Sequence, residues 1–103
     1  MPPNSTRLRK LVAMDEDDPL SRFALGQALF QEDENPETLN EAAEHLFFAN
    51  AKDSDHLATY HILGQLLIRL GRTDEARSVL EAGCAKTGGA GLGPAMAKLL
   101  ETL

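Results

Sequence analysis

Three histidines are the side chains in this 103-residue sequence best suited to binding a metal ion or carrying a phosphoryl group. His56 and His61 stand five residues apart, so on a helix their side chains would point about 140° apart, a poor geometry for sharing one ion. His45 falls in another segment, beside Glu44. The sequence therefore predicts no metal site, and we expect no cofactor.

The residues that follow His61 suggest a second kind of chemistry, phosphoryl transfer. His61-Ile-Leu-Gly-Gln is similar to a stretch of the helical histidine-phosphotransfer domains, which are also small acidic bundles. Those domains place a glycine four residues after the histidine and a lysine before that glycine. Here Gly64 follows His61 by three residues, and Leu63 precedes it. A signalling bundle centred on His61 is therefore kept as an alternative function.

The remaining reactive side chains do not form a catalytic set. Cys84 has no histidine near it in the sequence and falls within a helical pattern, which is typical of a small packing residue. The carboxylate runs 15–18 and 32–34 fall in predicted turns, where they would be solvated or would cap helices. We therefore expect no catalytic residues and predict that the chain is not an enzyme.

The net charge of −6 is spread unevenly, and this distribution limits the classes of partner. Residues 1–14 carry three bases and no acids, whereas residues 15–55 carry twelve acids and two bases. The acidic segment would repel phosphates, so we expect no nucleic acid partner. No stretch approaches the roughly 20 apolar residues of a membrane-spanning helix, and a single cysteine requires no oxidising compartment. The sequence therefore predicts a cytoplasmic protein with no membrane partner.

Composition and hydrophobic spacing both predict an all-α protein. Leu and Ala dominate the apolar residues, with four Phe, one Tyr and no Trp, which suits close helix packing better than a sheet. Apolar residues recur at helical spacing along almost the whole chain. We expect a short N-terminal helical segment with Leu8, Leu11 and Val12 on one face, then four longer helices and a short C-terminal helix.

Turn and cap residues predict where the longer helices begin and end. A polar residue followed by proline starts the first two of them, and a glycine stops the third. In chain order, the expected limits are Asp18 as cap of a helix from Pro19, Asn35 as cap of a helix from Pro36 to about Lys52, Ser54 or Asp53 as cap of a helix that stops at Gly71, Thr73 as cap of a helix that ends before Gly88, and a restart at Pro94.

The helices recur at nearly fixed offsets, which indicates an internal repeat. The second and fourth long helices align at an offset of 34 residues and the first and third at 38, so the first inter-helix turn carries an insertion. The small residues in these alignments would let neighbouring helices approach closely. The aligned pairs are Leu25 with Leu63, Gly26 with Gly64, Leu29 with Leu67, Ala42 with Ala76 and Leu46 with Leu80.

The second helix pair carries a recognisable run of residues: Tyr60-x-x-Leu63-Gly64-x-x-Leu67, a turn at Gly71, and Ala76-x-x-x-Leu80. This run resembles the tetratricopeptide repeat. The first copy departs from the pattern, with Arg22 where an aromatic residue is usual, and neither copy has the usual proline after its second helix.

The resemblance to tetratricopeptide repeats implies how the chain is organised. It covers residues 19–87 as two helix-turn-helix repeats in an α-α superhelix. Residues 1–18 would form an N-terminal helical and acidic segment, and residues 88–103 a Gly-rich linker with a C-terminal capping helix. The stripe on that last helix would cover the fourth long helix, or would pack against a second molecule and close a homodimer. Its members are Leu92, Met96, Leu99, Leu100 and Leu103.

The resemblance also implies a function as a protein-interaction module, an adaptor or scaffold that holds a peptide or partner domain on a concave face. The chaperone-binding branch of the family grips a C-terminal carboxylate with Lys, Asn and Arg, whereas Phe23, Gln27 and Ile62 stand at those positions here, so we expect no tight recognition of acidic chain termini. A self-assembling structural homodimer is an alternative. The expected partner-binding residues are Phe23, Gln27, Phe30 and Gln31 on the first long helix and His61, Gln65, Ile68 and Arg69 on the third.

Overall fold

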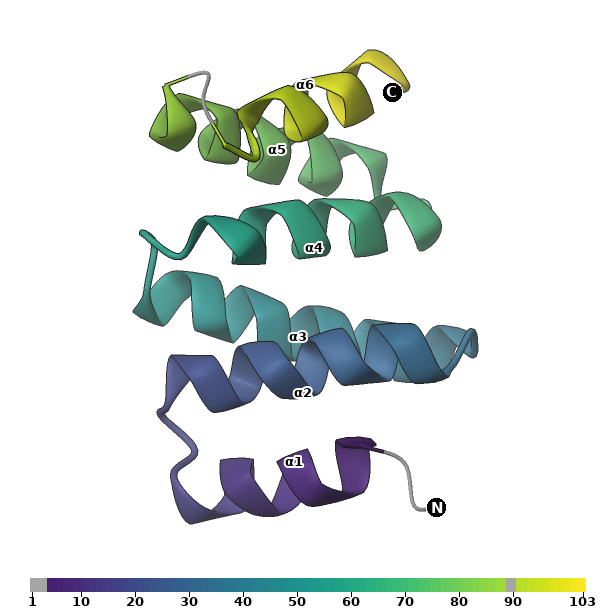
Figure 1. Ribbon diagram of the computed structural model, residues 1–103. Coiled ribbons are helices and arrows are strands. Elements are labelled where there is room, and N and C mark those ends of the chain that lie inside the picture. The colour runs from purple at the N-terminus through teal and green to yellow at the C-terminus, as the bar shows by residue number, and fades with distance from the viewer. Residues whose placement is uncertain (1–3, 89–90) are drawn as a thin grey trace. The chain divides into compact units, whose positions relative to one another are not determined.

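The computed structural model describes residues 4–88 and 91–103, and all the regular structure within those ranges is α-helical. This confirms the predicted all-α class. Within the same residues, no helix is both long and apolar enough to cross a membrane. The helices are α1 (Asn4–Met14), α2 (Pro19–Glu32), α3 (Pro36–Lys52), α4 (Leu57–Arg69), α5 (Thr73–Thr87) and α6 (Gly93–Glu101) (Figure 1).

The contacts divide the chain into two compact units, Met1–Ser54 and Asp55–Leu103. The N-terminal unit holds α1, α2 and α3, and the C-terminal unit holds α4, α5 and α6. The three segments expected from the sequence, 1–18, 19–87 and 88–103, divide the chain differently and stay a prediction. Part of the expected linker, residues 89–90, lies outside the described residues.

Proline and a polar cap start both long helices of the N-terminal unit, as the sequence predicts. The Asp18 carboxylate accepts a hydrogen bond from the Leu20 N–H, and Pro19 opens α2. Asn35 does the same for the Glu37 N–H ahead of α3, which ends at Lys52. A side-chain acceptor satisfies an N–H that the first turn leaves without a partner, while proline there has no N–H to satisfy.

The start of α4 corrects the sequence prediction. Neither Ser54 nor Asp53 caps it, because Asp53 is the C-terminal cap of α3 and its N–H bonds to the Ala49 carbonyl. The N-cap is His56, and α4 begins at Leu57. Since α3 continues to its predicted end, the residues that follow it are needed for the turn.

The turn between α4 and α5 is partly as expected. Gly71 ends α4 with a φ of +77°, and the Arg72 N–H bonds back to the Leu67 carbonyl, the six-residue closure of a Schellman motif. Thr73 is not the cap of α5 but its first residue, since Arg72 holds the cap position. The Arg72 guanidinium instead pairs with both oxygens of the Glu75 carboxylate, at 2.7 and 2.9 Å.

A close contact between α2 and α3 forms the centre of the N-terminal unit. A β-carbon at Gly26 would lie 2.7 Å from Leu46 Cγ and 3.0 Å from the Ala42 carbonyl oxygen, so only glycine fits without displacing its neighbours. Leu46 and Ala42 are fully buried. Both the glycine and the small residue predicted at the helix crossing therefore lie where the helices touch.

The C-terminal unit repeats this contact and adds α6. A β-carbon at Gly64 on α4 would lie 2.7 Å from Cγ of Leu80 on α5. On α6, Met96 is fully buried and belongs to one cluster with Tyr60 and Leu80, against which Leu92, Leu99, Leu100 and Leu103 pack. A β-carbon at Gly83 would lie 2.6 Å from Met96 Sδ and 2.8 Å from Tyr60 Cβ. The apolar stripe of α6 therefore covers α5 of its own chain, and Figure 1 shows the two helices side by side.

The three apolar residues predicted to share one face of the first helix differ in burial. Val12 is buried and Leu8 is half-buried, whereas the side chain of Leu11 is 44% exposed. Leu11 lies about 100° around the helix from Val12, where spacing alone does not fix the edge of the apolar face.

Candidate partner-binding site

Helix α2 presents a face that its own unit leaves partly uncovered. Phe23, Gln27 and Phe30 are half-buried on this face, Gln31 is exposed, and Leu20 in the first turn is 59% exposed. The spacing of 23, 27, 30 and 31 places the four predicted residues on one side of the helix. Residues 25 and 29, on the other side, are buried. The α2 face therefore combines large apolar side chains with two amides.

Helix α4 presents an equivalent face in the C-terminal unit. His61, Gln65 and Ile68 are half-buried and Arg69 is exposed, with the same spacing as on α2. The Gln65 amide nitrogen lies 3.2 Å from Nε2 of His61. Because an amide N–H₂ can only donate, Nε2 of His61 is the acceptor of this bond. The α4 face is therefore more polar than the α2 face and carries one cation.

The structure brings the eight predicted residues together in two groups of four. One group belongs to the N-terminal unit and the other to the C-terminal unit. Ile68 has a second role that the sequence did not reveal, because it also packs against the cluster of Tyr60, Leu80 and Met96.

A cluster around Phe48 was not predicted from the sequence. The Arg22 guanidinium lies over the Phe48 ring at 4.3 Å from the centroid, and the Lys52 ammonium lies 5.6 Å from it. Cations over an aromatic face are attracted to its quadrupole. The available signal was Arg22 itself, a cation at the position that the sequence alignment matches to Tyr60, which is buried. The side chain that compensates lies 26 residues away, beyond the reach of helical spacing.

The same arginine is joined to α1 through a chain of polar contacts. Arg22 Nη1 lies 3.2 Å from His45 Nδ1, and His45 Nε2 lies 3.2 Å from Glu41 Oε2. Arginine can only donate, so Nδ1 accepts and the Nε2 proton points at the carboxylate. The two Nη nitrogens of Arg9, on α1, each donate a hydrogen bond to the same carboxylate. Glu41 thus links α3 to α1. The hydrogen bond from Arg9, and to a smaller extent the one from His45, lowers the pKa of Glu41 below its ordinary value.

This contact predicts a loss of stability in acid. A carboxylate whose folded pKa is lowered contributes stability above its unfolded pKa, about 4.3 for Glu, and the contribution is lost as the pH falls through the folded value. Because Glu41 is partly exposed, we expect Glu41→Gln to cost at most about 1 kcal/mol at pH 7 and nothing at pH 2. Urea unfolding of both proteins at these two pH values would measure it. An equal difference at both would show that the charge of Glu41 does not matter.

The possible metal ligands and the single cysteine were located in residues 4–88 and 91–103. In these ranges no group of three or more His, Cys, Asp or Glu side chains is placed to hold a metal ion. Cys84 is half-buried on α5, with its Sγ 3.8 Å from the Gly93 carbonyl oxygen. Its environment is therefore the contact between α5 and α6.

No family model, curated protein or solved structure matches the chain.

Proposed function

We propose that the chain is a protein-interaction module built from two tetratricopeptide-type helix pairs, α2 with α3 and α4 with α5. Two features support this proposal. Each pair has the same contact, a glycine on its first helix against a buried leucine on its second. Each first helix also carries a partly uncovered face of four residues. The four residues that start at Phe23 have the same spacing as the four that start at His61. Such repeats place the first helices along a concave surface that holds a peptide or a partner domain.

The observation that carries the proposal is the α2 face. Two phenylalanines and a leucine that is 59% exposed lie beside two amides on a chain that is otherwise rich in acids. Large apolar groups beside amides suit a polypeptide, since apolar side chains supply affinity and amides can bond the backbone of a bound segment. The proposed partner is therefore a peptide or protein domain, bound in the cytoplasm, and no catalytic role is assigned.

Homodimerisation through the α6 stripe and phosphotransfer through His61, two alternatives predicted from the sequence, have less support. The apolar stripe of α6, which could have closed a homodimer, packs on α5 of its own chain through Met96. His61, the centre of the phosphotransfer alternative, is half-buried, and its Nε2 accepts a hydrogen bond from Gln65. Phosphorylation at that nitrogen would first have to break this bond.

Variants of the two faces test the proposal. We expect Leu20→Glu, and separately Phe23→Ala with Phe30→Ala, to lose the partners that the wild type retains from a lysate of the source organism. Arg69→Ala tests the α4 face in the same way. Truncating a buried anchor typically costs 1 kcal/mol or more, roughly fivefold or more in affinity.

The control is Ser78→Ala with Glu81→Ala, two exposed positions of α5. It should retain every partner, and circular dichroism should show all variants to be folded. If Leu20→Glu keeps the partners while folded, the α2 face is not the binding site. If the control loses them as well, binding does not depend on either face.

A further inference from the structure

The outer side of α1 carries large apolar side chains that neither the core nor the α2 face uses. In the described part of the chain, three large apolar side chains are well exposed: Leu20 at 59%, Leu11 at 44% and Met14 at 82%. Leu20 belongs to the α2 face. Leu11 lies in the last turn of α1 and Met14 is its last residue. Neither belongs to the core or to the α2 face.

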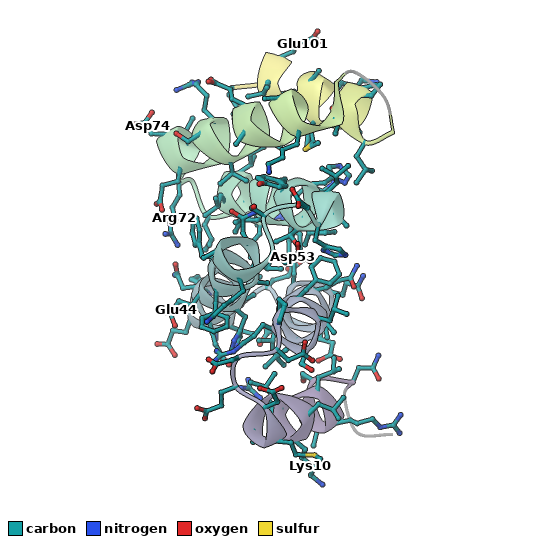
Figure 2. All side chains as sticks on the ribbon, turned by 90° about the vertical axis from the view of Figure 1, so that its left-hand side faces the viewer. Lys10, Glu44, Asp53, Arg72, Asp74 and Glu101 are labelled. Atoms are coloured by element: carbon teal, nitrogen blue, oxygen red, sulfur yellow. The ribbon has the colours of Figure 1, made fainter. Side chains whose placement is uncertain are left out.

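These two side chains lie in one stripe with two cations. Ser5 and Val12 are the buried residues of α1. The outer side holds Arg7, Leu11 and Met14 at helical spacing, with Lys10 beside them, a set that we call the α1 seam. Figure 2 shows Lys10 on the side of α1 that points away from α2. Among the described residues, Arg7 and Lys10 form no ion pair, in contrast to Arg9, which pairs with Glu41.

The charge of the chain changes sign where α1 ends. Residues 1–14 carry three bases and no acids, and the exposed turn that follows carries Asp15, Glu16 and Asp17. If two such helices lie side by side in opposite directions, the basic part of each faces the acidic turn of the other. A surface that complements itself after a twofold rotation is what an isologous dimer requires.

We propose that the α1 seam is a contact between two copies of this chain, with their α1 helices antiparallel. Leu11 and Met14 of both copies meet along the middle, and Arg7 and Lys10 of each copy lie beside Glu16 and Asp17 of the other. A uniformly acidic partner would meet repulsion at the turn, and a uniformly basic partner at the two cations. The second copy avoids both repulsions.

The size of the seam determines the strength of this contact. An 11-residue helix is about 16 Å long, so the seam buries less than the roughly 800 Å² per partner of a standard stable interface. The dimer is therefore weak, forms with increasing protein concentration, and loosens in high salt, because salt screens exposed charges. It does not depend on the proposed binding function of the α2 and α4 faces.

Sedimentation equilibrium over a range of concentrations tests the seam. Leu11→Asn with Met14→Gln removes the apolar centre and is expected to weaken dimerisation about tenfold or more, since each of these side chains loses its burial. The matched control, Thr6→Asn with Ala13→Gln, makes similar changes at exposed positions of α1 outside the seam and should dimerise like the wild type. Circular dichroism checks that all three proteins remain helical.

Charge reversal tests the antiparallel direction. Arg7→Glu with Lys10→Glu makes both the seam and the turn after it acidic, and Glu16→Lys with Asp17→Lys makes both basic. Asp15, whose carboxylate accepts from the Asp17 N–H, and Asp18, the cap of α2, are kept. Each variant alone should be monomeric at concentrations where the wild type dimerises. An equal mixture of the two should form heterodimers, because each copy then meets the opposite charge along the whole seam.

Three results would overturn the proposal. A wild type that stays monomeric at millimolar concentration would show that the seam does not join two copies of this chain. A dimer unchanged by Leu11→Asn with Met14→Gln would place self-association elsewhere on the chain. Reversed variants that fail to associate on mixing, although the wild type dimerises through the seam, would exclude the antiparallel arrangement.

Discussion

Leu80→Ala is expected to lower the free energy of unfolding by about 2–5 kcal/mol, the range for a buried leucine whose cavity cannot collapse. Leu80 is fully buried on α5, packs against Gly64 of α4 and belongs to the cluster with Tyr60 and Met96. Chemical unfolding followed by circular dichroism measures the loss. Ser78→Ala, an exposed change on the same helix, should stay within about 0.5 kcal/mol of the wild type.

The same leucine allows a test of the glycine contact through a double-mutant cycle. Gly64→Ala gains up to about 1 kcal/mol of helix propensity, but its methyl would lie 2.7 Å from Leu80 Cγ, and such overpacking costs about 1–3 kcal/mol. In the Leu80→Ala background the methyl has room, so Gly64→Ala should become neutral or stabilising. Strictly additive effects would show that the two residues do not limit each other.

Met96→Asp is expected to unfold the C-terminal unit or to destabilise it by more than any exposed change on α6. Met96 is fully buried between Tyr60 and Gly83, and a carboxylate there would be desolvated without a partner. The loss of the apolar side chain alone costs about 2–5 kcal/mol. Thermal unfolding and the helical signal of circular dichroism measure the result.

Ala97→Asp is the matched control for this change. It introduces the same carboxylate one residue further along α6, at an exposed position, so it has the same charge and nearly the same effect on helix propensity. It should leave the helical signal unchanged and move the unfolding midpoint by only a few degrees. If both variants lose the same stability, the damage comes from charge on α6 and not from the burial of Met96.

The sequence predicted local features of the fold well. Asp18-Pro19 and Asn35-Pro36 act through atoms within three residues of one another, so their effect does not depend on the rest of the molecule. The predicted start of α4 was wrong because Asp53 could serve either as the N-terminal cap of α4 or as the C-terminal cap of α3. Lys52 ends α3 where the sequence predicts, so Asp53 is the C-terminal cap of α3 and the cap of α4 falls three residues later, at His56.

Contacts between distant residues explain what the sequence did not reveal. Arg22 was recognised as a departure from the aromatic pattern, but its stacking on Phe48 depends on how α2 and α3 cross. Helical spacing also placed Ile68 on the α4 face without showing that it is shared with the core. Spacing along one helix shows which residues share a face, while the neighbour of that face is set by tertiary packing.

The order of the helix contacts has a consequence for how the protein folds. Among the described residues, contacts within each unit join helices that follow one another in the sequence, and α4 with α6 is the exception. Short chain segments close such contacts at little entropic cost, and domains of this type fold in microseconds to milliseconds. During synthesis, α1 to α3 can pack before α4 to α6 leave the ribosome. The N-terminal unit thus needs little protection from aggregation while the C-terminal unit is being synthesised.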